Sequence, residues 1–132
     1  MLVNWARPRR PTAALIALGS LLGTARCAAT REAPSQYVAG GHAERGAAAV
    51  RRYGCGSCHT IPGVRGAAGE AGPPLTRYAR RTYVAGMLPN TAENLVRWIE
   101  HPQQVVPGNA MPNLGVTDAE ARDIAAYLYT LR

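Results

Sequence analysis

Two cysteines and a histidine lie close together in the sequence, as Cys55-Gly56-Ser57-Cys58-His59. Thiols three positions apart can add to the two vinyl groups of one haem, and the imidazole that follows directly can then face the iron. The spacing therefore predicts one haem c, attached covalently through both cysteines, with His59 as an axial ligand of the iron.

Other chemistries use cysteines at this spacing. A thioredoxin-like redox pair needs βαβ surroundings, and the flanking sequence has no strand pattern. A structural zinc ion needs a fourth ligand nearby, but His42 and His101 are isolated in the sequence. A plain disulfide between Cys55 and Cys58 is the remaining alternative. Haem attachment is favoured because an export segment precedes the pair, and bacteria attach haem covalently outside the cytoplasm.

A second iron ligand is expected in a downstream loop. Met111 stands directly before Pro112, and its thioether is a soft ligand that favours reduced iron and raises the reduction potential. A residue before proline is restricted to extended geometry, which helps to fix the loop. The rival ligands are Met87 and His101, and the further alternative is that Met111 is an ordinary core or surface residue.

The elements that position these residues are predicted to be helices. Residues 42–53 are rich in helix-favouring Ala. Thr91 resembles an N-cap before apolar positions at helical spacing, and Pro102 ends that helix. Thr117 and Glu120 form a capping box in front of an amphipathic helix that reaches the C-terminus.

The segments between the helices are predicted to be long loops. Residues 61–74 and 105–115 are rich in Gly and Pro, and residues 75–89 read as loop or short helix. No strand pattern is visible. The fold class is therefore all-α, with three to four helices and Pro/Gly-rich loops. Loops this long are unusual in a compact domain unless they wrap around something.

Length and composition set limits on the fold. The chain has 132 residues, which is enough for one domain. Only 6% of the residues are aromatic and none is Phe, so the chain has little material for a large core of its own. Its 47% apolar and 17% charged residues exclude a disordered chain, and three cysteines exclude a dense disulfide scaffold.

The N-terminal segment has the composition of an export signal. Three arginines among the first ten residues precede an apolar run at 13–23, which is too short for a standard transmembrane helix. Residues 1–27 are therefore predicted to be a secretory signal or a lipoprotein leader. Cys27 is either lipidated or removed by cleavage nearby, or the leader stays uncleaved as an anchor. Residues 28–41 read as a flexible linker, and the domain is predicted over 42–132.

The net charge belongs largely to this leader. The whole chain carries fifteen basic residues, all Arg, against eight acidic ones, a formal charge of +7. The leader has four Arg and no acid, so residues 28–132 keep eleven Arg against eight acids, or +3. A nucleic-acid partner is therefore not expected.

Four motifs follow one another along the chain. They are Cys55 to His59, Gly72-Pro73-Pro74-Leu75, the helix with Trp98 that leads into Pro107-Gly108-Asn109-Ala110-Met111-Pro112, and Ala125-Ala126-Tyr127-Leu128. In their order and spacing, from about Glu44 to Arg132, the sequence resembles the class I cytochrome c family. The segment 83–98 looks most like small bacterial cytochromes c associated with terminal oxidases.

The resemblance implies a role for each matching residue. The carbonyl of Pro73 is expected to accept the second ring N–H of His59 and fix its orientation. Leu75 is expected to cover a haem face, Trp98 to lie by a haem propionate, and Met111 to be the distal iron ligand.

Three arginines follow the Gly-Pro-Pro-Leu motif and are candidates for pairing with haem propionates. Arg81 is the first choice among Arg77, Arg80 and Arg81 because of its distance after Pro73. The alternative is that all three form a solvated basic face. The first and last helices are expected to pack through Val50, Tyr53, Tyr127 and Leu128.

The implied function is electron transfer by a monohaem protein in the bacterial periplasm or at its membrane surface. A His/Met pair saturates the iron, so the protein alone is not expected to be an enzyme. The expected partner is a respiratory oxidase or another cytochrome, and the chain is expected to be a monomer. The alternatives are a haem-based ligand-binding protein or sensor, the haem module of a larger enzyme, and a non-catalytic haem subunit of an oxidase complex.

Overall fold

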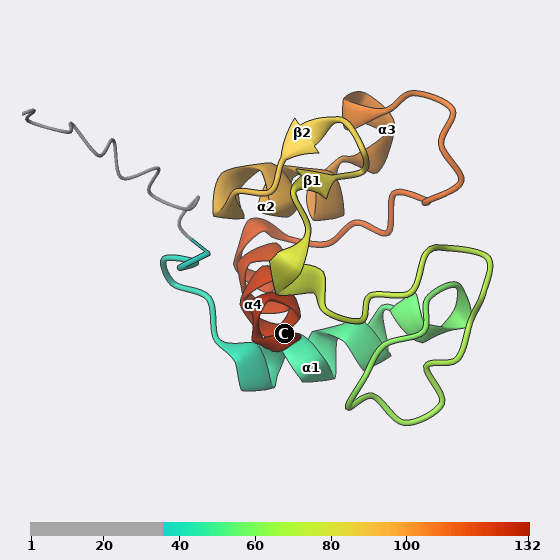
Figure 1. The fold of residues 1–132 in the computed structure, drawn as a ribbon, viewed down its shortest axis with the longest axis vertical. Coiled ribbons are helices and arrows are strands. Elements are labelled where there is room, and N and C mark those ends of the chain that lie inside the picture. The colour runs from blue at the N-terminus through green and yellow to red at the C-terminus, as the bar shows by residue number, and fades with distance from the viewer. Residues whose placement is uncertain (1–35) are drawn as a thin grey trace, which may run out of the picture. The chain divides into compact units, whose positions relative to one another are not determined.

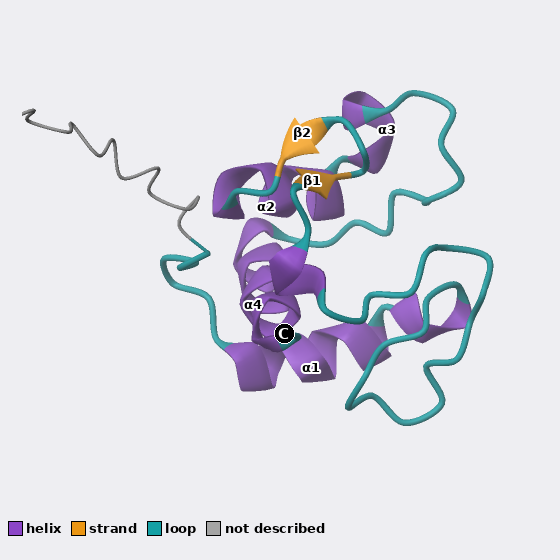
Figure 2. Cartoon of the chain, in the orientation of Figure 1, coloured by secondary structure: helices purple, strands orange, loops and turns teal. Residues whose placement is uncertain are grey.

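The structure is a computed structural model that describes residues 36–132. These residues form four α-helices, two short 3-10 helices and one small hairpin (Figures 1 and 2). The leader predicted over 1–27 and the linker as far as residue 35 lie outside the described residues. The elements are α1 (Ala43–Arg52), η1 (Cys55–Ser57), η2 (Tyr78–Arg80), β1 (Tyr83–Val84), β2 (Leu88–Pro89), α2 (Ala92–Glu100), α3 (Pro102–Val105) and α4 (Asp118–Thr130).

Helices α1 and α4 pack against each other more extensively than any other pair of elements. Gly46 makes this close approach possible, because a Cβ atom built there would lie 1.9 Å from the backbone oxygen of Asp123. Val50 and Leu128 are buried in the core, and Tyr53 and Tyr127 are packed at its edge. The first and last helices thus meet where the sequence predicts.

The first turn of α1 is capped by a carboxylate from α4. His42, the N-cap residue of α1, makes no side-chain cap, but its backbone N–H donates to Asp123 Oδ1 at 2.7 Å. Arg45 adds bonds of 2.8 and 3.0 Å to the same carboxylate and thereby lowers the pKa of Asp123, with help from the His42 N–H. Asp123 therefore joins the two helices at their crossing.

The predicted helix starts are confirmed. The Thr91 side chain accepts from the backbone N–H of Asn94 at 3.3 Å. The capping box of α4 is complete, because Thr117 and Glu120 each bond the other's backbone N–H. Pro102 does more than end α2, since it also occupies the first turn of α3, where a missing N–H costs nothing.

The expectation that the chain has no strands is wrong between residues 83 and 89. Strands β1 and β2 pair as an antiparallel hairpin. Three residues separate the paired Val84 and Leu88, and two of them, Ala85 (φ 52°) and Gly86 (φ 70°), are the central residues of a tight turn in which the Met87 N–H donates to the Val84 carbonyl at 3.0 Å. Each strand has two residues, which is too short to produce an alternating pattern in the sequence.

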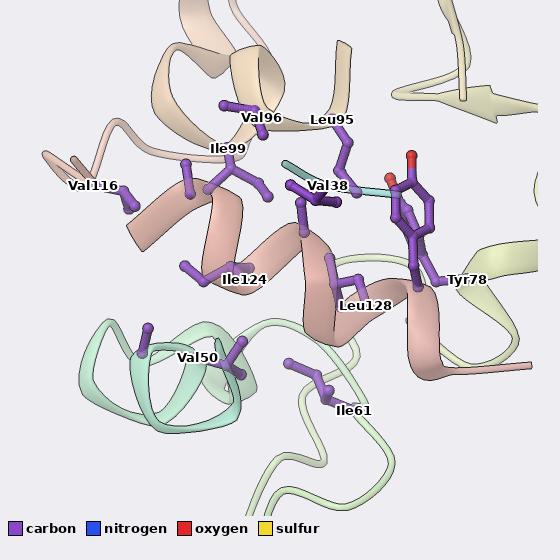
Figure 3. Packing of buried hydrophobic residues seen from close by; sticks show 14 of the residues in the cluster. Val38, Val50, Ile61, Tyr78, Leu95, Val96, Ile99, Val116, Ile124 and Leu128 are labelled. Carbon is purple, nitrogen blue, oxygen red and sulfur yellow. The ribbon is translucent and has the colours of Figure 1, made fainter. Parts of the chain in front are cut away.

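The core is built mainly from small aliphatic side chains. Figure 3 shows α4 between Leu95 and Ile99 of α2 and Val50 of α1, with Ile124 and Leu128 on α4 itself. The buried aromatic side chains of the described core are the tyrosines at 78 and 129, whose rings lie 6.3 Å apart. This modest core agrees with the low aromatic content.

A buried amide joins the hairpin segment to the core. Asn90 is 2% exposed, and its Nδ2 donates to the carbonyls of Arg81 (2.9 Å) and Tyr78 (3.3 Å). Its Oδ1 accepts from the hydroxyl of Tyr129 at 3.0 Å. Both ends of the Asn90 side chain are therefore satisfied, and η2 is tied to α4 through them.

Candidate functional site: a haem cavity

A cavity of about 460 Å³ lies among the helices and the two long loops. In Figure 1 the loop after α1 and the segment between α3 and α4 lie on the same side of α4. Both segments contribute residues to the wall of the cavity. The wall is mostly apolar, which is typical of a cofactor site. It includes every residue predicted for the site, namely Cys55, Cys58, His59, Pro73, Leu75, Arg81, Trp98 and Met111.

The two cysteines both belong to this wall. Cys55 begins η1 and Cys58 follows its last residue, and both are free thiols, half-buried. Burial raises the pKa of the Cys55 thiol, with a smaller contribution from neighbouring Cys58. Among residues 36–132 no group of three or more His, Cys, Asp or Glu side chains could hold a metal ion.

The imidazole of His59 is oriented by one hydrogen bond and lies against Gly72. Its Nδ1 lies 2.8 Å from the carbonyl oxygen of Pro73, and since a carbonyl only accepts, Nδ1 carries the proton. The other ring nitrogen, Nε2, is then a lone-pair donor suited to a metal. A Cβ at Gly72 would lie 2.4 Å from Cε1 of this ring, so a side chain there would force the imidazole to move.

Met111 is the candidate second ligand that reaches the cavity. Its side chain is half-buried and part of the wall. The rival Met87 sits beside the hairpin turn, is 66% exposed and does not border the cavity. His101, between α2 and α3, is also exposed and away from it.

Arg81 is the one of the three candidate arginines that borders the cavity. It is half-buried, with its guanidinium 4.8 Å from the ring centre of Tyr78 and bonded to the carbonyl of Pro74. Arg77 and Arg80 are exposed and do not border the cavity. Trp98 and Leu75 are half-buried in the wall.

Sequence reasoning missed Tyr78 as a site residue. It is 4% exposed, borders the cavity, and burial raises the pKa of its hydroxyl. It lies on a 3-10 helix of three residues, which gives no periodic pattern. In a chain with six Tyr and no Phe, the scarcity of rings was the one signal that a tyrosine would serve as a wall residue.

The residues around the cavity fit a haem c. The wall offers two free thiols at the attachment spacing, an imidazole with an available Nε2, and a thioether from a separate segment. These are the donors that covalent attachment and His/Met ligation of iron require.

The chain belongs to the cytochrome c family. Residues 43–132 match that family, "Cytochrome c", so the mostly helical fold is a cytochrome c fold. The family implies haem c with iron and haem-based electron transfer.

The similar curated proteins fall into two kinds. The chain is 37% identical over 93 residues to cytochrome c oxidase subunit 2 of Alkalihalophilus pseudofirmus, which is 68% of this chain and 26% of that protein. It is 30% identical to the corresponding subunit of Bacillus subtilis over 94 residues, with the same coverage. It is 49% identical over 43 residues to cytochrome c2 of Rhodopila globiformis, 32% of this chain and 41% of that protein. No solved structure gives a significant match.

The chain thus spans about a quarter of the length of the oxidase subunits it matches. In the described part of the chain, no helix is long and apolar enough to cross a membrane.

Proposed function

We propose that this chain is a monohaem electron carrier of the bacterial periplasm or its membrane surface. Cys55 and Cys58 would attach the haem, and His59 and Met111 would be the ligands of its iron. The observation that carries the proposal is the single cavity bordered by all eight predicted residues, which come from distant parts of the sequence.

Different residues of the chain contribute different functions to such a carrier. When bound, haem c supplies reversible one-electron chemistry at iron. The hydrogen bond to the Pro73 carbonyl keeps Nε2 of His59 available and limits rotation of its ring, and the missing side chain at Gly72 leaves room for that ring. Buried Leu95 and Ile99 exclude water from the cavity wall. Because His59 and Met111 would both ligate the iron, a substrate would find no free ligand position, and the chain alone is proposed not to be an enzyme.

Two residues of the wall are proposed to orient the haem. Arg81 is the arginine assigned to a propionate, because it alone among the three candidates reaches the cavity. Trp98 is assigned to the same region, and Leu75 to one haem face. The tie from Arg81 to the Pro74 carbonyl and to the Tyr78 ring keeps the guanidinium near the site.

The proposed partner is a respiratory oxidase or another cytochrome. The similarity to oxidase subunit 2 and to cytochrome c2 supports this class of redox partner. Tyr83 and Leu114 are exposed and also border the cavity, so an apolar rim is available for weak, rapid docking of a monomer. The same relatives favour a second candidate, a haem subunit built into an oxidase complex, which would co-purify with that complex.

Export is proposed from the sequence of the leader. Residues 1–27 direct the chain out of the cytoplasm, residues 28–41 link leader and domain, and residues 42–132 form the cytochrome domain. The attachment to the membrane, where it occurs, is through a lipid on Cys27 or through an uncleaved leader.

Carbon monoxide tests the carrier function. The reduced wild-type protein is expected to keep its visible spectrum for minutes under carbon monoxide, because Met111 occupies the position that the gas needs. The positive control is the Met111→Ala variant, which should bind the gas at once. Rapid binding by the wild-type protein, with loss of the Met–iron absorption band, would instead favour a ligand-binding protein or sensor.

Intact-mass spectrometry of protein isolated from its host tests attachment and export. The denatured chain is expected to retain the mass of one haem and to lack the leader, or to carry a lipid at Cys27. Cys58→Ala is the matched variant, since only one thioether can then form. A denatured wild-type chain without haem would contradict covalent attachment, and a full-length chain without lipid would leave only the uncleaved anchor.

A further inference from the structure

Side-chain amides hold the segment that carries Met111. Residues 106–117 form neither helix nor strand. Gln103, on the preceding helix α3, reaches into this segment with both ends of its amide. Its Nε2 donates to the carbonyls of Asn109 (2.9 Å) and Met111 (2.8 Å), and its Oε1 accepts from the Gly108 N–H at 3.2 Å.

Asn109 completes the arrangement from within the segment. Its Nδ2 donates to the carbonyls of Pro102 (2.9 Å) and Val106 (2.6 Å), which anchors it to α3. Its Oδ1 accepts from the Met111 N–H at 2.7 Å. Both backbone polar groups of Met111 are therefore bonded to side-chain amides, the N–H to Asn109 and the carbonyl to Gln103.

We propose that Gln103 and Asn109, together called the amide clamp, are positioning residues that determine how readily Met111 leaves the haem iron. The inference rests on the proposed function, because it takes Met111 to be the distal ligand. Gln103 does not border the cavity and bonds only the backbone of the Met111 segment, so it acts on the iron through Met111. Asn109, in contrast, also borders the cavity and bonds Pro102 of α3.

The physical reason is the flexibility of the ligand and of its segment. A Met side chain has three rotatable bonds, so the place of its sulfur depends on where the backbone is held. A segment without regular backbone hydrogen bonds can open locally at a low free energy. Each hydrogen bond of the clamp is lost on opening, and the clamp therefore lowers the fraction of molecules in which Met111 is displaced.

Imidazole measures this fraction directly. It competes for the distal position of oxidised iron, and its apparent dissociation constant is the intrinsic constant divided by the fraction of molecules with that position open. Gln103 is exposed to solvent, so the loss of its three bonds is expected to change that fraction about tenfold rather than by several orders of magnitude.

The experiment compares Gln103→Leu with Gln104→Leu in the haem-loaded full chain. Gln104 is the matched control, since it is an exposed Gln on the same helix whose side chain makes none of these bonds. Imidazole is titrated against the Met–iron absorption band of the oxidised protein. We expect an apparent dissociation constant about tenfold lower for Gln103→Leu and close to wild type for Gln104→Leu.

A third variant separates positioning from general loss of stability. Val96 is 5% exposed on α2 and does not border the cavity. Val96→Ala should lower the urea midpoint of unfolding but leave the imidazole affinity unchanged. If Val96→Ala shifts the affinity as much as Gln103→Leu does, the clamp has no specific role and the inference is overturned.

The remaining outcomes are also decisive. Equal imidazole affinities for the two Gln→Leu variants would overturn the inference and leave Met111 as the ligand. A wild-type protein with no Met–iron band would overturn the proposed ligation itself. If Gln103→Leu does not accumulate with haem, the pair Gln103→Glu and Gln104→Glu decides, because the Glu at 103 cannot donate to the carbonyls of Asn109 and Met111.

Discussion

Replacement of Met111 with Ala is expected to lower the reduction potential by on the order of a few hundred millivolts, a part of the ~0.8 V range over which axial ligands set haem potentials. The thioether favours reduced iron, and its loss leaves water or a weak ligand in its place. Potentiometric titration gives the midpoint, and the visible spectrum should lose the Met–iron absorption band.

The matched control for this variant is Met87→Ala. It removes the same side chain from a position that is 66% exposed and does not border the cavity. The potential and the spectrum of Met87→Ala should equal those of the wild type. An unchanged visible spectrum in Met111→Ala would refute the assignment of the distal ligand, and a changed spectrum in Met87→Ala would transfer it to that residue.

Replacement of Gly46 with Ala is expected to lower the free energy of unfolding by about 3 kcal/mol. Helix propensity alone predicts the opposite sign, since Ala is favoured over Gly by about 1 kcal/mol within a helix. The steric clash outweighs the gain in helix propensity, because the added Cβ would lie 1.9 Å from the backbone oxygen of Asp123 and 2.8 Å from Cβ of Tyr127. Helices α1 and α4 must move apart to make room for it.

Urea unfolding of the haem-loaded protein measures the effect. Ala48→Gly is the control in the same helix, at an exposed position, and should cost only about 1 kcal/mol from helix propensity. A Gly46→Ala variant more stable than the wild type would show that the two helices do not cross as closely as the structure has them.

The features that the sequence predicted well depend on residues near one another in the chain. The attachment motif at Cys55 to His59 occupies little more than one helical turn, so its spacing can be recognised without knowledge of the fold. The caps at Thr91 and Thr117 are local in the same way, because an N-cap bonds an N–H two or three residues further on. The family resemblance adds the order in which the motifs follow one another, and it implies that Met111 is the second iron ligand.

Contacts between residues that are distant in the sequence could not be predicted in this way. Asp123 lies within the C-terminal helix, where a charged residue would be expected on the solvent side, yet it is 5% exposed and bonded to His42 and Arg45. Asn90 is likewise a polar residue in a turn-like sequence that the fold buries. Burial of a polar group is stable only when partners from other segments satisfy it, and a single sequence does not display those partners.

The amino-acid sequence alone was therefore sufficient to predict the haem chemistry, because the thiols and the imidazole that are proposed to act together are neighbours in the chain. Tertiary structure was needed to choose Arg81 over Arg77 and Arg80 and to remove Met87 as a candidate ligand, since those choices depend on which side chains reach a cavity closed by remote segments. It also revealed why position 46 is a glycine, because the atom that a side chain there would strike belongs to a helix near the other end of the chain.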